Sequence, residues 1–171
     1  YGANAGIMIT ASHNPAKYNG YKAYGPDGCQ VTDDAAAAIY AEIQKTDILE
    51  GAKLIPFDEG LSSGRIRYVG DDCKEALYDA IKARSVRPGL CKTAGLKLVY
   101  SPLNGSGLVP VTRILHDIGI TDITIVPEQE YPDGNFPTCP YPNPEIFEAL
   151  RLGLELAKKI GADLMLATDP D

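Results

Sequence analysis

The sequence is poor in the residues that build zinc sites and disulfide frameworks. Its 171 residues include 4 cysteines and 2 histidines. A structural zinc site needs clustered Cys and His ligands, and the chain has no Cys-x-x-Cys pair, so this class of site is excluded. The wide spacing of the cysteines favours reduced thiols in a cytoplasmic protein. The cysteines are Cys29, Cys73, Cys91 and Cys139.

Long apolar runs and an amino-terminal leader are also missing. No stretch is long and apolar enough to span a bilayer, so we expect no membrane partner. No signal peptide opens the chain, which starts at Tyr1 without Met. Because a strand and its loop are predicted within a few residues, we expect the chain to be a part excised from a longer protein.

An excess of positive charge is absent as well. The chain has 16 Lys and Arg against 23 Asp and Glu, which gives a formal net charge of −7. This balance argues against a nucleic-acid partner and against docking to anionic lipid, although a local phosphate site remains compatible with it. Hydrophobic residues make up 44%, an ordinary balance for a globular protein of one or two domains.

The most informative stretch lies near the start of the chain. The apolar residues 7–9 predict a short buried strand, and the polar run that follows, Thr10-Ala11-Ser12-His13-Asn14-Pro15, predicts a loop at its end. Ser12 is therefore a candidate nucleophile presented by a rigid element. No Gly-x-Ser-x-Gly motif surrounds it, so an acyl-transfer hydrolase is not indicated.

The end of the chain carries a second polar loop. Residues 164–167 predict a buried strand, and Thr168-Asp169-Pro170-Asp171 follows it. Two alternating carboxylates at a strand end are typical of a site for a hard cation such as Mg²⁺, which takes oxygen ligands. A plain surface turn is the alternative interpretation of the same tripeptide.

Between these loops, strands alternate with helices. We predict strands at 20–24, 97–100, 123–126 and 164–167, and helices at 32–45, 71–84, 109–118 and 145–160, the last with Ile146, Leu150, Leu154 and Ala157 on its apolar face. Residues 49–64 are predicted to be an irregular connector, and 65–69 either a strand or a linker. The pattern predicts an α/β fold with mixed or mainly parallel sheets and flanking helices, in which ligands bind at the carboxyl ends of strands. The loop 104–107 follows such a strand, but it lacks a Walker lysine, so nucleotide binding is not favoured.

The serine loop, with Lys22 and the run 21–28 after it, closely resembles the active-site loop of the α-D-phosphohexomutases, the phosphoglucomutase/phosphomannomutase superfamily. Asp169-Pro170-Asp171 resembles the family's metal loop, Asp-x-Asp-x-Asp-Arg, of which this chain holds the first two carboxylates. Residues 132–137 and 142–145 resemble the family's second domain. The resemblance implies that 1–64 are the end of domain 1 and that 65–171 are domain 2, ending in a truncated metal loop.

The resemblance also implies roles for individual residues. Ser12 would carry the phosphoryl group, and it would bind Mg²⁺ together with Asp169 and Asp171. Lys22 would contact the substrate and either stabilise the transferring phosphoryl group or move a proton, the alternative being an exposed strand lysine. His13 would either contact the phosphate or orient the loop. Asn14 is expected to fix the loop backbone, while Lys17 and His116 are interpreted as surface and structural residues.

The expected function is that of a phosphoglucomutase, which interconverts hexose 1-phosphate and hexose 6-phosphate through a phosphoserine and a sugar bisphosphate, with the bisphosphate also acting as activator. The run 21–28 favours this member of the family. Phosphomannomutase, phosphoglucosamine mutase and phosphopentomutase are the alternatives, and a non-catalytic fragment that binds phosphate and a cation is another. By itself the chain is expected to be inactive, and its sequence leaves the oligomeric state open.

Overall fold

The computed structural model describes all of residues 1–171, which form two compact units. The first unit comprises Tyr1–Met8 and Lys22–Leu77, and the second comprises Ile9–Tyr21 and Tyr78–Asp171. The serine loop is therefore part of the second unit. Because these units interleave along the chain, the predicted domain boundary at residue 64 stays a prediction.

The second unit is built on a parallel sheet of three strands. β3 (Lys97–Ser101) lies at the centre, between β4 (Asp122–Ile125) and β5 (Leu164–Ala167). Val99 of β3 pairs with Thr124 on one side and with Met165 on the other. The parallel order confirms the predicted α/β fold, and it brings the carboxyl ends of all three strands to one edge of the sheet.

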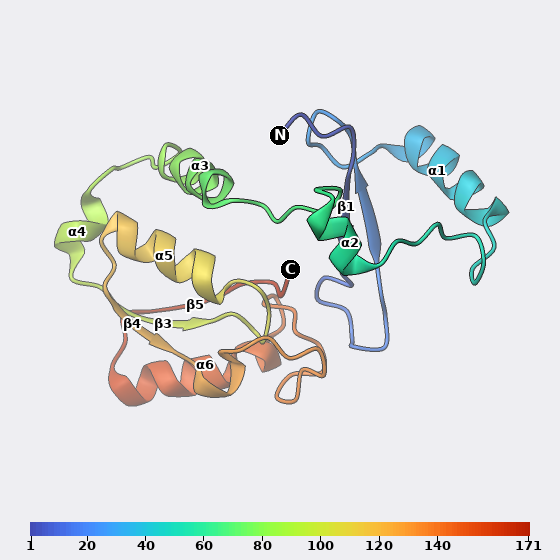
Figure 1. Ribbon diagram of the computed structural model, residues 1–171. Helices are drawn as coiled ribbons and strands as arrows, with labels where there is room; N and C mark the ends of the chain where they lie inside the picture. Colours follow the sequence, from blue (N-terminus) through green and yellow to red (C-terminus); the bar gives the residue numbers. More distant parts are fainter. The chain divides into compact units, whose positions relative to one another are not determined.

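Two helices cover the faces of this sheet. α5 (Leu108–Ile118) lies on one face and α6 (Phe147–Ile160) on the other (Figure 1). α5 ends at Gly119, whose φ of 106° is the left-handed conformation that glycine adopts at a helix end. The helices and the sheet bury two apolar clusters; the first contains Leu98, Tyr100, Leu115 and Ile120, and the second contains Leu103, Cys139 and Ala149.

The apolar face predicted for α6 needs a correction. The buried residues of this helix are Ala149 and Gly153, whereas Ile146 precedes the helix and is 40% exposed. A Cβ on Gly153 would collide with the side chain of Met165. The other predicted residues, Leu150, Leu154 and Ala157, are half-buried, so the correction concerns Ile146. The helix comes close to β5 at Gly153.

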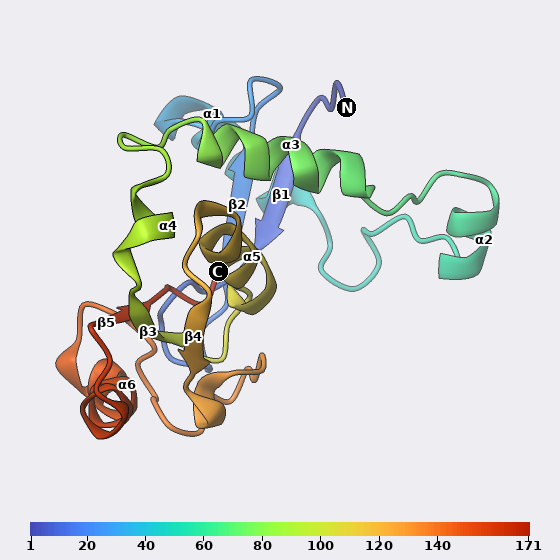
Figure 2. The same ribbon diagram turned by 90° about the vertical axis from the view of Figure 1, so that its left-hand side faces the viewer.

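Most residues of a two-stranded sheet belong to the first unit, and its strands β1 (Gly6–Ile9) and β2 (Tyr21–Tyr24) lie side by side (Figure 2). The turn after β2 returns the chain so that Tyr24 bridges antiparallel to Gln30. The prediction that 7–9 are buried is wrong, because Ile7 and Ile9 are each 61% exposed. The strand therefore forms by pairing with β2 and not by burial of these side chains.

Three short helices were not predicted from the sequence. α2 (Phe57–Ser62) lies inside the expected connector, α4 (Leu90–Ala94) follows α3 (Asp71–Lys82), and the 3₁₀ helix η1 (Pro127–Gln129) follows β4. Each is too short to show a hydrophobic period. Residues 65–69 form no strand and lie within the first unit. α1 (Asp33–Lys45) begins after Thr32 as predicted, but the Thr32 side chain makes no capping hydrogen bond.

The structure shows free thiols at all four cysteines, of which Cys139 is buried. None of its helices combines the length and the apolar character that crossing a bilayer requires.

An ionic cluster joins the end of α3 to α5 within the second unit. Asp117 accepts hydrogen bonds from Arg113 Nε at 3.0 Å and from Lys82 Nζ at 3.3 Å. The Arg113 guanidinium also lies over the ring of Tyr78, 5.3 Å from its centroid. The hydrogen bond from Arg113, followed by that from Lys82, lowers the pKa of Asp117 below its usual value. When the Asp117 carboxyl is ionised, the cluster therefore stabilises the contact between the end of α3 and α5.

We predict that Asp117→Asn lowers the melting temperature at neutral pH. A carboxyl whose folded pKa is lowered stabilises the protein above its unfolded pKa, about 3.9, and loses that contribution as the pH falls through the folded value. The difference in melting temperature between the two proteins should therefore shrink below about pH 4. Calorimetric melting of both proteins at a series of pH values from 7 to 3 measures this difference in melting temperature. The control is Asp79→Asn, since Asp79 contacts Lys82 alone and is 74% exposed; an equal loss in both variants would contradict the prediction.

Candidate active site at the serine loop

The structure brings Ser12 together with the two carboxylates at the end of the chain. Ser12 Oγ lies 3.1 Å from Asp169 Oδ1 and 3.2 Å from Asp171 Oδ1. In addition, Thr10 Oγ1 lies 3.3 Å from Asp171 Oδ2. These contacts join residues more than 150 positions apart, as 157 positions separate Ser12 from Asp169. The two loops predicted to share a site therefore meet within the second unit.

The backbone of the serine loop is strained at Ser12 itself. Its φ of 54° is left-handed, a conformation that is uncommon for residues other than glycine. The loop holds this conformation through short hydrogen bonds: the Ser12 N–H donates to Thr10 Oγ1 at 2.9 Å, and Asn14 Nδ2 donates to the Ala11 carbonyl at 2.9 Å. Asn14 thus fixes the backbone as predicted. Strain of this kind gathers at functional sites, where it aims a side chain.

His13 contacts the same carboxylate from the other side. Its Nδ1 lies 2.7 Å from Asp169 Oδ2, so Asp169 uses one oxygen for Ser12 and the other for His13. With the carboxylate ionised, the imidazole is the donor. The His13 side chain is 43% exposed and that of Asp169 33%, so solvent reaches the pair. This contact joins His13 to the carboxylate loop, and both roles considered for His13 stay predictions.

The loop after β3 contacts the carboxylate loop. The Ser106 N–H donates to the Pro170 carbonyl at 2.8 Å, and a Cβ on Gly105 would collide with the Pro170 backbone. The Tyr100 hydroxyl lies 2.9 Å from Thr168 Oγ1. Sequence reasoning missed Tyr100, because a tyrosine inside an apolar strand carries no signal of a polar contact.

The atoms gathered here are of the type that Mg²⁺ prefers. Two carboxylates and one hydroxyl converge, all of them oxygen donors. No group of three or more His, Cys, Asp or Glu side chains forms a metal cluster in this chain. The donor chemistry fits a Mg²⁺ ion that keeps most of its shell for water or phosphate oxygens.

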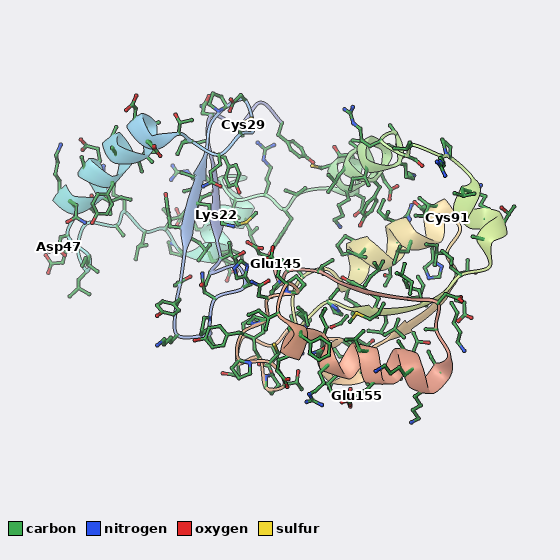
Figure 3. The ribbon with its side chains drawn as sticks, turned by 180° about the vertical axis from the view of Figure 1, so that it is seen from behind. Lys22, Cys29, Asp47, Cys91, Glu145 and Glu155 are labelled. Carbon is green, nitrogen blue, oxygen red and sulfur yellow. The ribbon has the colours of Figure 1, made fainter.

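Three further residues were candidates from the sequence. Lys22 is a half-buried residue of β2, labelled in Figure 3, and its role stays a prediction. Lys17 is exposed and lies 5.1 Å from the centroid of the Tyr18 ring. His116 is an exposed residue of α5 near its end, and its structural role stays a prediction.

Comparison with known proteins covers nearly the whole chain. The family model described as "Phosphoglucomutase/phosphomannomutase, alpha/beta/alpha domain II" matches residues 75–171, and the corresponding model for domain I matches residues 1–50. A phosphoglucomutase of Staphylococcus saprophyticus is 36% identical over 168 residues, which cover 98% of this chain and 30% of that protein. A Schizosaccharomyces pombe protein named "Probable phosphoribomutase" is 38% identical over 179 residues, covering 99% and 29%.

A solved structure of a putative phosphomannomutase from Thermus thermophilus superposes with a TM-score of 0.73 at 26% identity, covering 99% of this chain and 35% of that one. This chain thus spans about 30% of the length of the curated relatives it matches. The serine loop, its two carboxylates and the parallel sheet that supports them all lie within the matched residues, and the chain belongs to the phosphoglucomutase/phosphomannomutase family.

Proposed function

We propose that the protein containing this chain is a phosphoglucomutase-type phosphotransferase that interconverts hexose 1-phosphate and hexose 6-phosphate. The observation that carries the proposal is the contact of a strained loop serine with Asp169 and Asp171, two carboxylates from the far end of the sequence. Membership of a family of mutases supports the reaction class. The name of the Staphylococcus relative supports the hexose substrate.

In the proposed reaction Ser12 carries the phosphoryl group. A sugar hydroxyl attacks the phosphorus, the bond from phosphorus to Ser12 Oγ breaks, and a sugar bisphosphate forms. The bisphosphate turns around, and Ser12 Oγ then attacks its other phosphoryl group, which regenerates the phosphoserine and releases the isomerised monophosphate. Added sugar bisphosphate acts as activator because it phosphorylates any Ser12 that has lost its group.

The other residues position the reacting groups and balance their charge. Phosphoryl transfer depends mainly on alignment and on charge neutralisation. His13 orients Asp169 through its 2.7 Å contact, and Lys22 is proposed to stabilise the transferring group or to move the proton of the sugar hydroxyl. Mg²⁺, held by Asp169, Asp171 and a phosphate oxygen on Ser12, would neutralise charge on the phosphoryl oxygens.

A substrate panel tests the proposal. The full-length protein is assayed with glucose, mannose, glucosamine and ribose 1-phosphates, with the matching bisphosphate and Mg²⁺ present. The proposal expects the highest turnover with glucose 1-phosphate. Preference for ribose 1-phosphate would support the second candidate, a phosphopentomutase, which the 38% identical phosphoribomutase relative favours. The isolated chain should be inactive, because reorienting a bisphosphate needs groups on both sides of it.

We predict that the isolated chain binds Mg²⁺ weakly. Mg²⁺ demands a near-octahedral shell and sheds water reluctantly. With Ser12 unphosphorylated, the chain offers two carboxylates and one neutral hydroxyl. Titration calorimetry should give a dissociation constant no tighter than about 1 mM, the range of weak oxygen-ligand sites. Tight, stoichiometric binding that is lost in Asp169→Ala would show instead that two carboxylates suffice.

A further inference from the structure

The residues on either side of Asp169 are both restrained by the end of β3 and the loop after it. On one side, the Thr168 N–H donates to the Ser101 carbonyl at 3.2 Å, and Thr168 Oγ1 lies 2.9 Å from the Tyr100 hydroxyl. On the other side, the Pro170 carbonyl accepts the Ser106 N–H at 2.8 Å. Asp169 therefore lies between two residues that are each hydrogen-bonded to the end of β3 or to the loop after it.

The Tyr100 hydroxyl is held firmly in place. Tyr100 is fully buried at 0% exposure, with its ring in the apolar cluster of the second unit. Burial raises the pKa of its phenol, so the hydroxyl keeps its proton at neutral pH. Gly107 closes the space around this contact, since a Cβ there would collide with the Tyr100 hydroxyl and lie 2.7 Å from Thr168 Oγ1. The hydroxyl is therefore closely surrounded on this side.

We propose that Tyr100 is a positioning residue, whose buried hydroxyl acts through Thr168, together with the Ser106 N–H on Pro170, to aim the Asp169 carboxylate at Ser12. The positioning of Asp169 by Tyr100 is inferred from these hydrogen bonds alone. Its consequence rests on the proposed function, because an aimed carboxylate serves the reaction only if Asp169 binds the cation beside the phosphoserine.

The test removes the hydroxyl and keeps the ring. In Tyr100→Phe, amide hydrogen exchange at Thr168 and Ser106, followed by NMR on the whole chain, should accelerate about fivefold, the factor given by loss of one net hydrogen bond. The matched control is Tyr78→Phe, a buried tyrosine at the α3–α5 contact, 7% exposed. It should leave both amides unchanged. Unchanged exchange in Tyr100→Phe, or equal acceleration in both variants, would overturn the proposal.

A second variant distinguishes the loss of this hydrogen bond from a general loss of stability. Thr168→Val removes the partner hydroxyl, and it should reproduce the exchange pattern of Tyr100→Phe, with the double variant no faster than either single one. Additive effects in the double variant would mean that the two hydroxyls act separately, which also overturns the proposal.

Cation binding separates this inference from the proposed function. The probe is Mn²⁺, followed by its electron paramagnetic resonance, with full-length protein phosphorylated on Ser12. Its dissociation constant should rise about fivefold in Tyr100→Phe and stay unchanged in Tyr78→Phe. Faster exchange with unchanged Mn²⁺ affinity would refute the link to the cation. If the unsubstituted protein binds no Mn²⁺ and takes no phosphate, the proposed function fails, while the exchange result still decides the positioning role.

Discussion

Replacing Ser12 with alanine in the full-length protein is expected to reduce mutase turnover by at least about 10⁴-fold, the scale of loss on removing a covalent nucleophile. The loss follows because Ser12 Oγ contacts both carboxylates, at 3.1 Å from Asp169 and 3.2 Å from Asp171, whereas the Thr10 hydroxyl contacts Asp171 and already accepts the Ser12 N–H. Steady-state assay with glucose 1-phosphate and its bisphosphate measures the effect. Intact mass of the unsubstituted protein should show one phosphoryl adduct on the Ser12 peptide, and the variant should lack it.

Folding should be affected little by this change. Ser12 is a half-buried loop residue, and such substitutions usually shift the unfolding free energy by less than about 1 kcal/mol. Ser85→Ala is the matched control, since Ser85 is an exposed residue between α3 and α4. It should keep full turnover and the phosphoryl adduct. Substantial turnover in Ser12→Ala, with the adduct found on another residue, would remove Ser12 from the mechanism.

Gly20→Ala is expected to have the second-largest effect, through the shape of the serine loop. A Cβ on Gly20 would collide with the carbonyl oxygen of Thr10, a backbone atom that cannot turn away. The two residues also share a hydrogen bond, from the Thr10 N–H to the Gly20 carbonyl at 3.1 Å. The substitution therefore pushes Thr10 outward, and with it the hydroxyl that accepts the Ser12 N–H.

Overpacking of this kind lowers the free energy of unfolding by about 1–3 kcal/mol. Displacing a reacting group by about 1 Å lowers the reaction rate about 100-fold. Gly20→Ala should thus lower turnover about 100-fold, with a fall in melting temperature. Gly134→Ala is the control, because a Cβ at Gly134 meets nothing within 4 Å. Normal activity and normal phosphorylation of Ser12 in the Gly20 variant would show that the loop tolerates the shift.

The parts of the fold that could be predicted are those with a strong local signal. The helices α1, α3, α5 and α6 each show a clear apolar period, and Gly119 and Gly161 mark helix ends because their left-handed φ favours glycine. The short helices α2 and α4 carry too few residues to show a period. The exposure of Ile7 and Ile9 was mispredicted because burial depends on what packs over a strand, which the strand's own residues do not specify.

By its sequence alone, the chain determined the family, the candidate nucleophile Ser12 and the two carboxylates, since each of these depends on residue identity in a short motif. Only the tertiary structure decided how they are used. Ser12 contacts Asp169, although 157 positions separate them in the sequence, and His13 contacts the second oxygen of the same carboxylate. The Ser106 N–H donates a hydrogen bond to the Pro170 carbonyl. The fold also brings the buried Tyr100 hydroxyl to Thr168. The contacts of Ser106 and Tyr100 with the last loop arise because β3 and β5 run parallel and end at the same edge of the sheet. Ser12 follows β1, a strand outside that sheet, so its contact with Asp169 depends on long-range packing that no local pattern in the chain encodes.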